Sequence, residues 1–176
     1  MRRALILMTS LAASVAPVAA QESSAARDAY LDSVARFFDL PPAEIEILSD
    51  WEIPVSEIPV VLFMARRSGV SPEALVALRE GGQSWTSLAA RYRVGPAVLQ
   101  VPVPDDVPAG VLSRVYEGYR TTPVARWGTI RLADEDIVGL VNVRVISQSL
   151  GLPAENVLAR TDSSDSYVEL FAQLHR

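Results

Sequence analysis

Two 24-residue stretches of the chain, 69–92 and 151–174, match each other when the sequence is shifted by 82 residues without a gap. Six of the aligned positions are identical, and at three more an apolar residue is aligned with another apolar residue. The match extends over a glycine turn, a serine that precedes a helix, and the apolar positions of that helix, which a shared composition alone would not align. The sequence therefore predicts two copies of one structural unit.

Each copy is predicted to be a unit of three helices. An apolar helix comes first, at 58–68 in one copy and at 140–150 in the other, and a glycine ends it. A second helix follows, and then a short third helix that begins with a serine cap and an aromatic residue. The residues expected to hold these units together are Gly69, Trp85, Leu88, Gly151, Tyr167 and Leu170.

Two copies are too few to stack as a solenoid, but their apolar helices can cover each other. We therefore predict an all-α fold in which the duplicated three-helix unit packs as a pseudo-twofold helical domain. The predicted organisation is a signal peptide at 1–20, acidic N-terminal helices at 21–55, the first copy at 56–100, a proline-rich linker and arginine/aromatic crossover at 101–133, and the second copy at 134–176.

The N-terminal residues have the three-part pattern of a secretory signal peptide. Arg2 and Arg3 precede an uncharged apolar run, and Val18 and Ala20 are small enough for the pocket of a signal peptidase. The run is shorter than the about 20 apolar residues that a membrane span needs. We expect cleavage after Ala20, a periplasmic or secreted protein, and no stable membrane span after cleavage. An uncleaved membrane anchor is the alternative.

The charge of the chain argues against nucleic acid as a partner. All 16 basic residues are arginines and two precede residue 21, so that 14 stand against 21 acidic residues in the remainder, a net charge of −7. Such a chain repels phosphate backbones. The helices of 69–92 have the look of a DNA-reading pair, and the last carries Arg91 and Arg93, but its counterpart carries Glu169 and Gln173. We therefore expect no nucleic-acid binding.

Few residues of the chain are suited to catalysis. Cysteine is absent, and the only histidine, His175, is the penultimate residue, where chains tend to fray. Two carboxylate pairs, Asp134 with Asp136 and Asp105 with Asp106, would suit a hydrolase. Negative charge at a helix N-terminus and a solvated turn explain the same pairs. We expect no catalytic residue, with a carboxylate-dependent hydrolase as the alternative.

Asp162, Asp165 and Glu169 offer oxygen atoms to a calcium ion. Their spacing differs from that of a calcium-binding loop, and no central glycine allows the sharp turn of such a loop. A serine-rich loop between two helices explains the segment better. We expect neither a metal nor a cofactor.

The densest mixture of arginine and aromatic residues lies in 118–132. Such a mixture can bind a protein partner or an anionic glycan. In the alternative interpretation, the tryptophan fills the interface between the copies and the arginines pair with the acidic N-terminal region. The candidate contacts for a partner or glycan are Tyr119, Arg120, Arg126, Trp127 and Arg131.

Residues 82–101, GQSWTSLAARYRVGPAVLQV, are similar to part of a LysM module, the small glycan-binding unit of cell-wall proteins. The similarity lies in the glycine, the serine, the Leu-Ala-x-Arg-Tyr run and the valines, and it implies peptidoglycan binding. The asparagine usual after the second helix is absent, and VPVPDDVP replaces the strand that follows in the module. No binding residue is therefore transferred.

Three motifs resemble a family of uncharacterised exported bacterial proteins: EIPVV at 57–61, ALREGGQSW at 77–85 and WGTIRLADEDIVGLVN at 127–142. This resemblance covers most of the chain after the signal peptide and implies export and a shared architecture, without an activity. The expected function is that of an exported, non-enzymatic helical protein that binds an unknown protein or cell-envelope component or has a structural role in the envelope. A peptidoglycan-binding module and a hydrolase are the alternatives.

Overall fold

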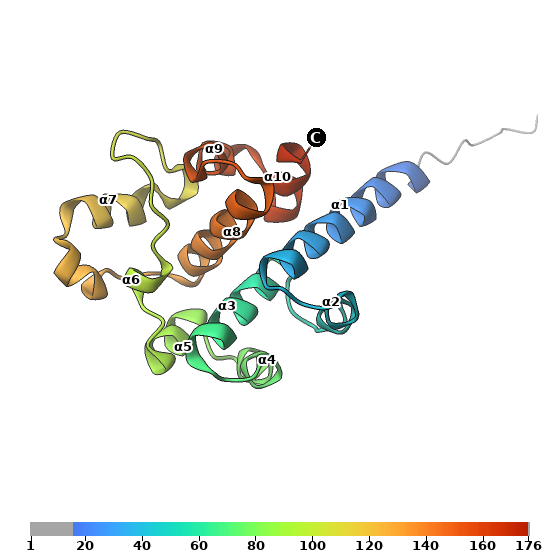
Figure 1. Ribbon diagram of the computed structural model, residues 1–176, viewed down its shortest axis with the longest axis horizontal. Coiled ribbons are helices and arrows are strands. Elements are labelled where there is room, and N and C mark those ends of the chain that lie inside the picture. The colour runs from blue at the N-terminus through green and yellow to red at the C-terminus, as the bar shows by residue number, and fades with distance from the viewer. Residues whose placement is uncertain (1–15, 176) are drawn as a thin grey trace, which may run out of the picture.

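The computed structural model describes residues 16–175, and every regular element among them is a helix, which confirms the all-α class. In chain order the α-helices are α1 (Ala16–Phe37), α2 (Pro42–Ser49), α3 (Ile58–Ser68), α4 (Pro72–Glu80), α5 (Trp85–Tyr92), α6 (Pro96–Leu99), α7 (Ser113–Thr121), α8 (Asp134–Leu150), α9 (Ala154–Leu158) and α10 (Tyr167–Leu174) (Figure 1). Short 3-10 helices lie between them: η1 (Val55–Glu57), η2 (Gly110–Leu112), η3 (Val124–Thr129) and η4 (Thr161–Ser163).

Helix α8 is the centre of the fold and contacts α1, α3, α5, α6, α9 and α10. Its first turn carries Asp134, Glu135 and Asp136, negative charges that stabilise the N-terminus of a helix. Beyond that turn it is apolar on nearly every side, which is typical of a helix surrounded by others. The alternating valines of 141–145 would also suit a strand, but they lie in this helix and are all buried.

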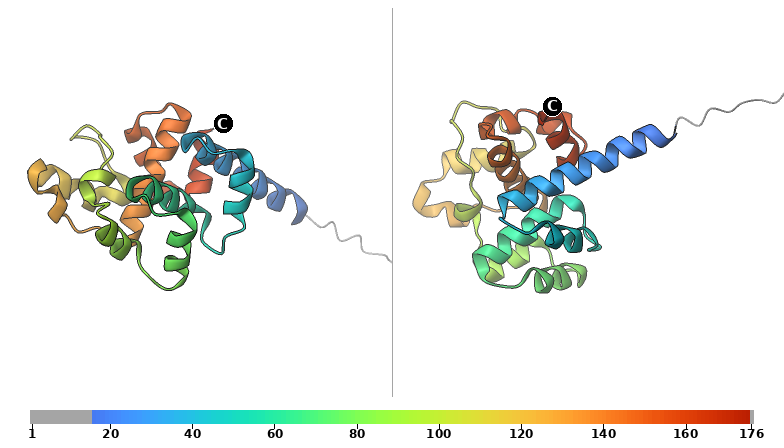
Figure 2. Two further views of the ribbon diagram at one scale, coloured as in Figure 1. Left: turned by 60° about the horizontal axis from the view of Figure 1, so that its bottom comes forward. Right: turned by 45° about the vertical axis from the view of Figure 1, so that its right-hand side comes forward.

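Helix α1, at the start of the described chain, packs against α10 at its end. It packs against α8 and α10 on one side and α2 on the other, and Figure 2 shows it lying across the molecule between them. The ring of Tyr30 meets the edge of Phe171 in α10, with 5.9 Å between the ring centroids. Among the side chains from residue 24 onward whose burial is described, Tyr30 is the first that is buried.

Most of the predicted signal peptide, residues 1–15, lies outside the described residues, and the predicted cleavage site falls inside α1. Within residues 16–175, no helix is both long enough and apolar enough to cross a membrane. Cleavage and export stay predictions.

The α-helices of the two predicted units follow one another in the same order, but the 3-10 helix η4 lies between the last two α-helices of the second unit. In one, α3 ends at Gly69 and is followed by α4 and α5; in the other, α8 ends at Gly151 and is followed by α9 and α10. Gly69 has a φ of 73° and Gly151 a φ of 63°, the left-handed conformation in which glycine commonly ends a helix. The helices α3 and α8 pack against each other, as expected of the two apolar helices. The pseudo-twofold relation between the units stays a prediction.

The serine caps of the two third helices are confirmed. The side chain of Ser84 accepts a hydrogen bond from the amide of Ser87 at 3.1 Å, and that of Ser166 accepts one from the amide of Glu169 at 3.1 Å. The aromatic residues that follow these caps differ in burial. Trp85 is completely buried, whereas Tyr167 is half-buried and lines a cavity.

The segment 101–133 contains more structure than a linker. Residues 101–109 form no helix, as their prolines predict, but α7 follows. Its inner face consists of Val115, Tyr116 and Tyr119, which are buried. The hydroxyl of Tyr116 donates a hydrogen bond to the Val101 carbonyl at 2.9 Å, so α7 holds the preceding loop in place.

Candidate functional site

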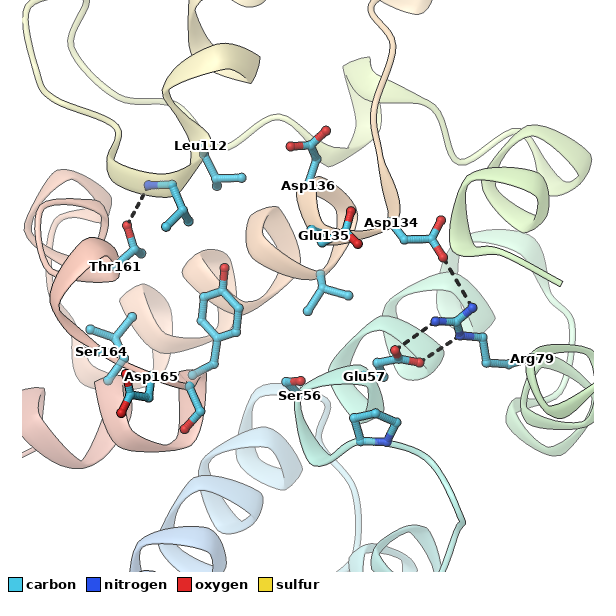
Figure 3. Close-up of a pocket in the computed structure, with 16 residues that line it drawn as sticks. Ser56, Glu57, Arg79, Leu112, Asp134, Glu135, Asp136, Thr161, Ser164 and Asp165 are labelled. Atoms are coloured by element: carbon cyan, nitrogen blue, oxygen red, sulfur yellow. Dashed lines mark hydrogen bonds and ion pairs between the residues drawn. The ribbon is translucent and has the colours of Figure 1, made fainter. Parts of the chain in front are cut away.

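The larger of the two cavities described here has a volume of about 480 Å³ and lies between η1, α4, η2, α8, η4 and the start of α10. We call it the acidic cavity. Figure 3 shows residues of η1, α4 and the start of α8 on one side of it and residues of η4 and the α10 cap on the other. Its lining consists of Pro54, Ser56, Glu57, Arg79, Val111, Leu112, Asp134, Glu135, Asp136, Val138, Thr161, Ser164, Asp165, Ser166, Tyr167 and Leu170.

Arg79 joins two carboxylates on one wall of this cavity. Its Nε donates to Oε2 of Glu57 at 2.9 Å and its Nη2 to Oε1 at 3.0 Å, a two-pronged pair that suits the planar guanidinium group. Its Nη1 lies 3.3 Å from Oδ2 of Asp134. The hydrogen bond with Glu57 raises the pKa of Arg79 above its ordinary value. Arg79 therefore stays charged and is held between the two carboxylates.

Asp134 attaches the start of α8 to the start of α5. Its carboxylate accepts hydrogen bonds from the amides of Trp85 at 3.0 Å and Thr86 at 2.9 Å, and from the Thr86 hydroxyl at 2.9 Å. Burial alone would raise the pKa of the Asp134 carboxyl, but these hydrogen bonds and the charge of Arg79 together lower it. Asp134 is thus an ionised link between the two units.

The other two carboxylates at the start of α8 differ in their surroundings. Asp136 is buried, accepts a hydrogen bond from the amide of Ala133 at 2.6 Å and pairs with the Arg114 guanidinium group. Glu135 is exposed, and within residues 16–175 its carboxylate takes part in no hydrogen bond or ion pair. Glu135 is therefore the carboxylate of this helix that is available to a ligand.

Tyr167 contributes a neutral hydroxyl from the opposite wall. This hydroxyl lies over Gly139 of α8, so close that a Cβ at that position would be 2.8 Å from it. Burial raises the pKa of Tyr167 to about 12, and the charge of Asp136 acts in the same direction. Its hydroxyl is therefore protonated at neutral pH.

Negative charges outnumber positive charges in the lining of the acidic cavity. Its carboxylates belong to Glu57, Asp134, Glu135, Asp136 and Asp165, and Arg79 is the cation among its lining residues. Apolar side chains such as Leu112, Val138 and Leu170 also line the cavity. An uneven charge over an apolar lining suits a cationic group attached to an apolar body.

The aromatic residues predicted to contact a partner or glycan are used within the fold. Tyr119 is buried, and its hydroxyl donates to the Pro96 carbonyl at 2.8 Å. Trp127 is half-buried against the Tyr119 ring, and its Nε1 donates to the carbonyls of Tyr119 and Thr122 at 3.1 and 3.0 Å. These two side chains therefore hold η3 against α7 instead of filling the interface between the units.

The three arginines of the same segment are exposed. Arg120 donates hydrogen bonds to the carbonyls of Pro104 at 3.4 Å and Val107 at 2.7 Å. Its partners are therefore in the proline-rich loop, and the alternative prediction of a pairing with the acidic N-terminal region is wrong for this residue. Arg126 and Arg131 lie outside both cavities.

The remaining candidates for catalysis or metal binding lie apart from the acidic cavity or have structural contacts. Asp105 and Asp106 are exposed in the proline-rich loop. His175 is exposed, and its ring stacks on Phe171 with 5.2 Å between the centroids. Glu169 accepts hydrogen bonds from the Asp165 amide and the Gln173 side chain. Among the described residues, no three histidine, cysteine or acidic side chains are grouped so as to hold a metal ion.

Comparison of the chain with models of known protein families, with curated proteins and with solved structures gives no match. Residues 82–101, which resemble a LysM module, form α5 and α6 with no strand beside them in the described part of the chain. The geometry of the acidic cavity is therefore the observation from which a function can be inferred.

Proposed function

We propose that this protein is an exported, non-enzymatic binding protein and that the acidic cavity is its ligand site. The observation that supports this is a cavity of about 480 Å³ with five carboxylates, one guanidinium group and an apolar lining, to which several helices contribute. Cavities of this size and position commonly bind small ligands or side chains. The ligand is a cationic group on an apolar body, such as an alkylammonium ion or a basic side chain of a partner protein.

The hydrogen bonds of the carboxylates favour binding over acid–base catalysis. A general acid needs a carboxyl group with a raised pKa, whereas the pKa of Asp134 is lowered by its contacts. Asp136 is occupied by the Ala133 amide and by Arg114. Both members of this carboxylate pair therefore connect parts of the fold, which leaves Glu135 free to attract a cation.

The proposal of export rests on the sequence pattern of residues 1–20. The positive start, the apolar run and the small residues before Gln21 are those of a signal peptide. Sequencing the N-terminus of the protein recovered from a bacterial periplasm tests this proposal. A chain that begins at Gln21 supports it, and an intact chain recovered from the cytoplasm contradicts it.

Calorimetric titration with hexylammonium tests the ligand class. Hexanoate has the same apolar body with the opposite charge and is the control. We expect hexylammonium to bind and hexanoate not to bind at the acidic cavity. Glu135→Gln should weaken hexylammonium binding about three-fold or more, because it removes a charge that no internal contact uses.

A matched control is Glu117→Gln, which changes an exposed glutamate of α7 that does not line the cavity. It should leave the affinity for hexylammonium unchanged. Equal binding of hexylammonium and hexanoate, or the same affinity in Glu135→Gln as in the unmodified protein, would refute the proposed ligand class.

A further inference from the structure

A second cavity, of about 440 Å³, lies on another side of α8, where the ends of α1 and α3 meet its C-terminal half. We call it the arginine cavity. Its lining is unlike that of the acidic cavity, since it contains three arginines, three phenylalanines and a glutamine but no carboxylate. These residues are Phe37, Phe38, Phe63, Arg66, Arg67, Arg144 and Gln148.

The three guanidinium groups have no anionic partner among the described residues. Arg79 and Arg114 form ion pairs with acidic side chains, whereas Arg66, Arg67 and Arg144 take part in no ion pair within the described residues. The chain as a whole has a net charge of −5, so acidic side chains are plentiful. Like charges close together without a counter-ion destabilise the protein, and such an arrangement is a mark of a binding site for the opposite charge.

Arg144 is fixed in the floor of this cavity by one side of its guanidinium group. Its Nη2 donates to three carbonyls at the end of α6, with distances between 2.8 and 3.2 Å, from Val98, Leu99 and Gln100. Its Nε is buried and has no hydrogen-bond partner. Burial lowers the pKa of Arg144, and the nearby charge of Arg67 lowers it further. The negative charge of an anion near this group would offset both effects on the pKa.

The phenylalanine rings lie beside the same guanidinium groups. The guanidinium carbon of Arg144 is 5.2 Å from the centroid of Phe63, and that of Arg67 is 5.3 Å from it. Arg66 lies 5.3 Å from the centroid of Phe38. Phe37 packs edge-on against Phe38 and is half-buried. Phe38 and Phe63 are buried, so the cavity presents the exposed part of the Phe37 ring beside the positive charges.

We propose that the arginine cavity binds a small organic anion that carries a carboxylate or phosphate group on an apolar or aromatic body. The planar guanidinium group matches the oxygen atoms of both anions. Arg66 and Arg67 are exposed at the rim and contact the anionic group, while Arg144 supplies charge from below. The body of the ligand lies against Phe37, the partly exposed ring of the cavity.

Titration calorimetry with phenyl phosphate and with benzoate tests this proposal for the two anionic groups. Inorganic phosphate lacks the apolar body, and benzylamine has the ring with the opposite charge. We expect phenyl phosphate or benzoate to bind about ten-fold or more tightly than inorganic phosphate, because the rings bury apolar surface. Benzylamine should not compete with the bound anion.

The variant Arg67→Gln tests whether the anion binds at the arginine cavity. Arg67 is exposed and takes part in no hydrogen bond or ion pair within residues 16–175, and its contact is with the ring of Phe63, so we expect Arg67→Gln to keep the fold. We expect anion binding to weaken about ten-fold, the loss typical of one charge-assisted hydrogen bond. Arg91→Gln is the control, since Arg91 is likewise exposed and lies near an aromatic ring, that of Tyr92, but outside the cavity.

Two results would overturn the proposal: no binding of either aromatic anion, or an affinity that is the same in Arg67→Gln as in Arg91→Gln. The tests of the two cavities are independent. Arg67→Gln should not change the affinity for hexylammonium, and Glu135→Gln should not change that for phenyl phosphate. Failure at one cavity is therefore distinguishable from failure at the other.

Discussion

The hydroxyl of Tyr30 donates a hydrogen bond to Oδ1 of Asn142, which is 112 residues away in the chain, and both side chains are completely buried. The side-chain Nδ2 of Asn142 donates in turn to the carbonyls of Ser56 at 2.9 Å and Val138 at 2.8 Å. One asparagine thus connects α1, α8 and the segment that leads into η1. Burial raises the pKa of Tyr30, so its hydroxyl remains a proton donor over the whole useful pH range.

Replacing Asn142 should therefore lower the free energy of unfolding more than removing the hydroxyl of Tyr30. We expect Tyr30→Phe to lower the free energy of unfolding by about 1–2 kcal/mol, the usual effect of losing one buried hydrogen bond. Asn142→Ala should lower it by about 3 kcal/mol or more, because it leaves several buried polar groups without partners. Urea denaturation measures both values. The reverse order of the two effects would contradict the central role of Asn142.

Trp85→Ala should lower the free energy of unfolding by about 3 kcal/mol or more. Trp85 has no exposed surface and lies in the main hydrophobic core, so the truncation leaves a large void. Trp51→Ala is a suitable control, because Trp51 is only half-buried, and its effect should be smaller. An effect near zero for Trp85→Ala, measured by urea denaturation, would mean that the indole ring is not part of the core.

The stability of the protein should fall in acid partly through Asp134. Its pKa is lowered in the folded protein, so its contribution is present above its unfolded pKa of about 4 and is lost as the pH falls through the lower, folded value. Asp134→Asn should be less stable at neutral pH and should lose less stability between about pH 5 and pH 2. Asp105→Asn, at an exposed position, is the control. Thermal melts over this range measure the difference, and parallel profiles of Asp134→Asn and the unmodified protein would contradict it.

Gly110→Ala should destabilise the protein because two restrictions act at this position. Gly110 has a φ of 51°, and a Cβ there would lie 2.0 Å from Oγ1 of Thr161 and 2.5 Å from the carbonyl oxygen of Leu158. The left-handed conformation alone costs about 1–2 kcal/mol for alanine, and the overlap adds to it. Gly128→Ala is the matched control, since a Cβ at Gly128 meets no atom within 4 Å and φ there is not positive. Equal melting temperatures for the two variants would refute this interpretation.

The ends of the helices were predictable because short-range chemistry determines them. Glycine alone adopts the left-handed conformation at little cost, so Gly69 and Gly151 mark the ends of α3 and α8. The hydroxyls of Ser84 and Ser166 can satisfy a free amide three residues later, which marks the starts of α5 and α10. These signals depend on a few neighbouring residues and are therefore visible in the sequence.

The cavities were not predictable because they depend on contacts between distant residues. Glu57, Arg79 and Tyr167 come from three elements, and no spacing in the sequence shows that they line one space. Arg66 and Arg67 are far from Arg144 in the sequence, although the three arginines line one cavity in the fold. Helix α7 was missed for another reason, since its mixture of arginine and tyrosine suggested a binding surface.

The packing of α1 against α10 has a consequence for the newly made chain. Until the segment around Phe171 has been synthesised, the inner surface of α1 lacks one of its partners, because the ring of Tyr30 rests on that phenylalanine. Neither half of the polypeptide can therefore complete its structure alone. A chain shortened at its C-terminus would expose an apolar surface on α1, near the N-terminus, and such a surface promotes aggregation and degradation.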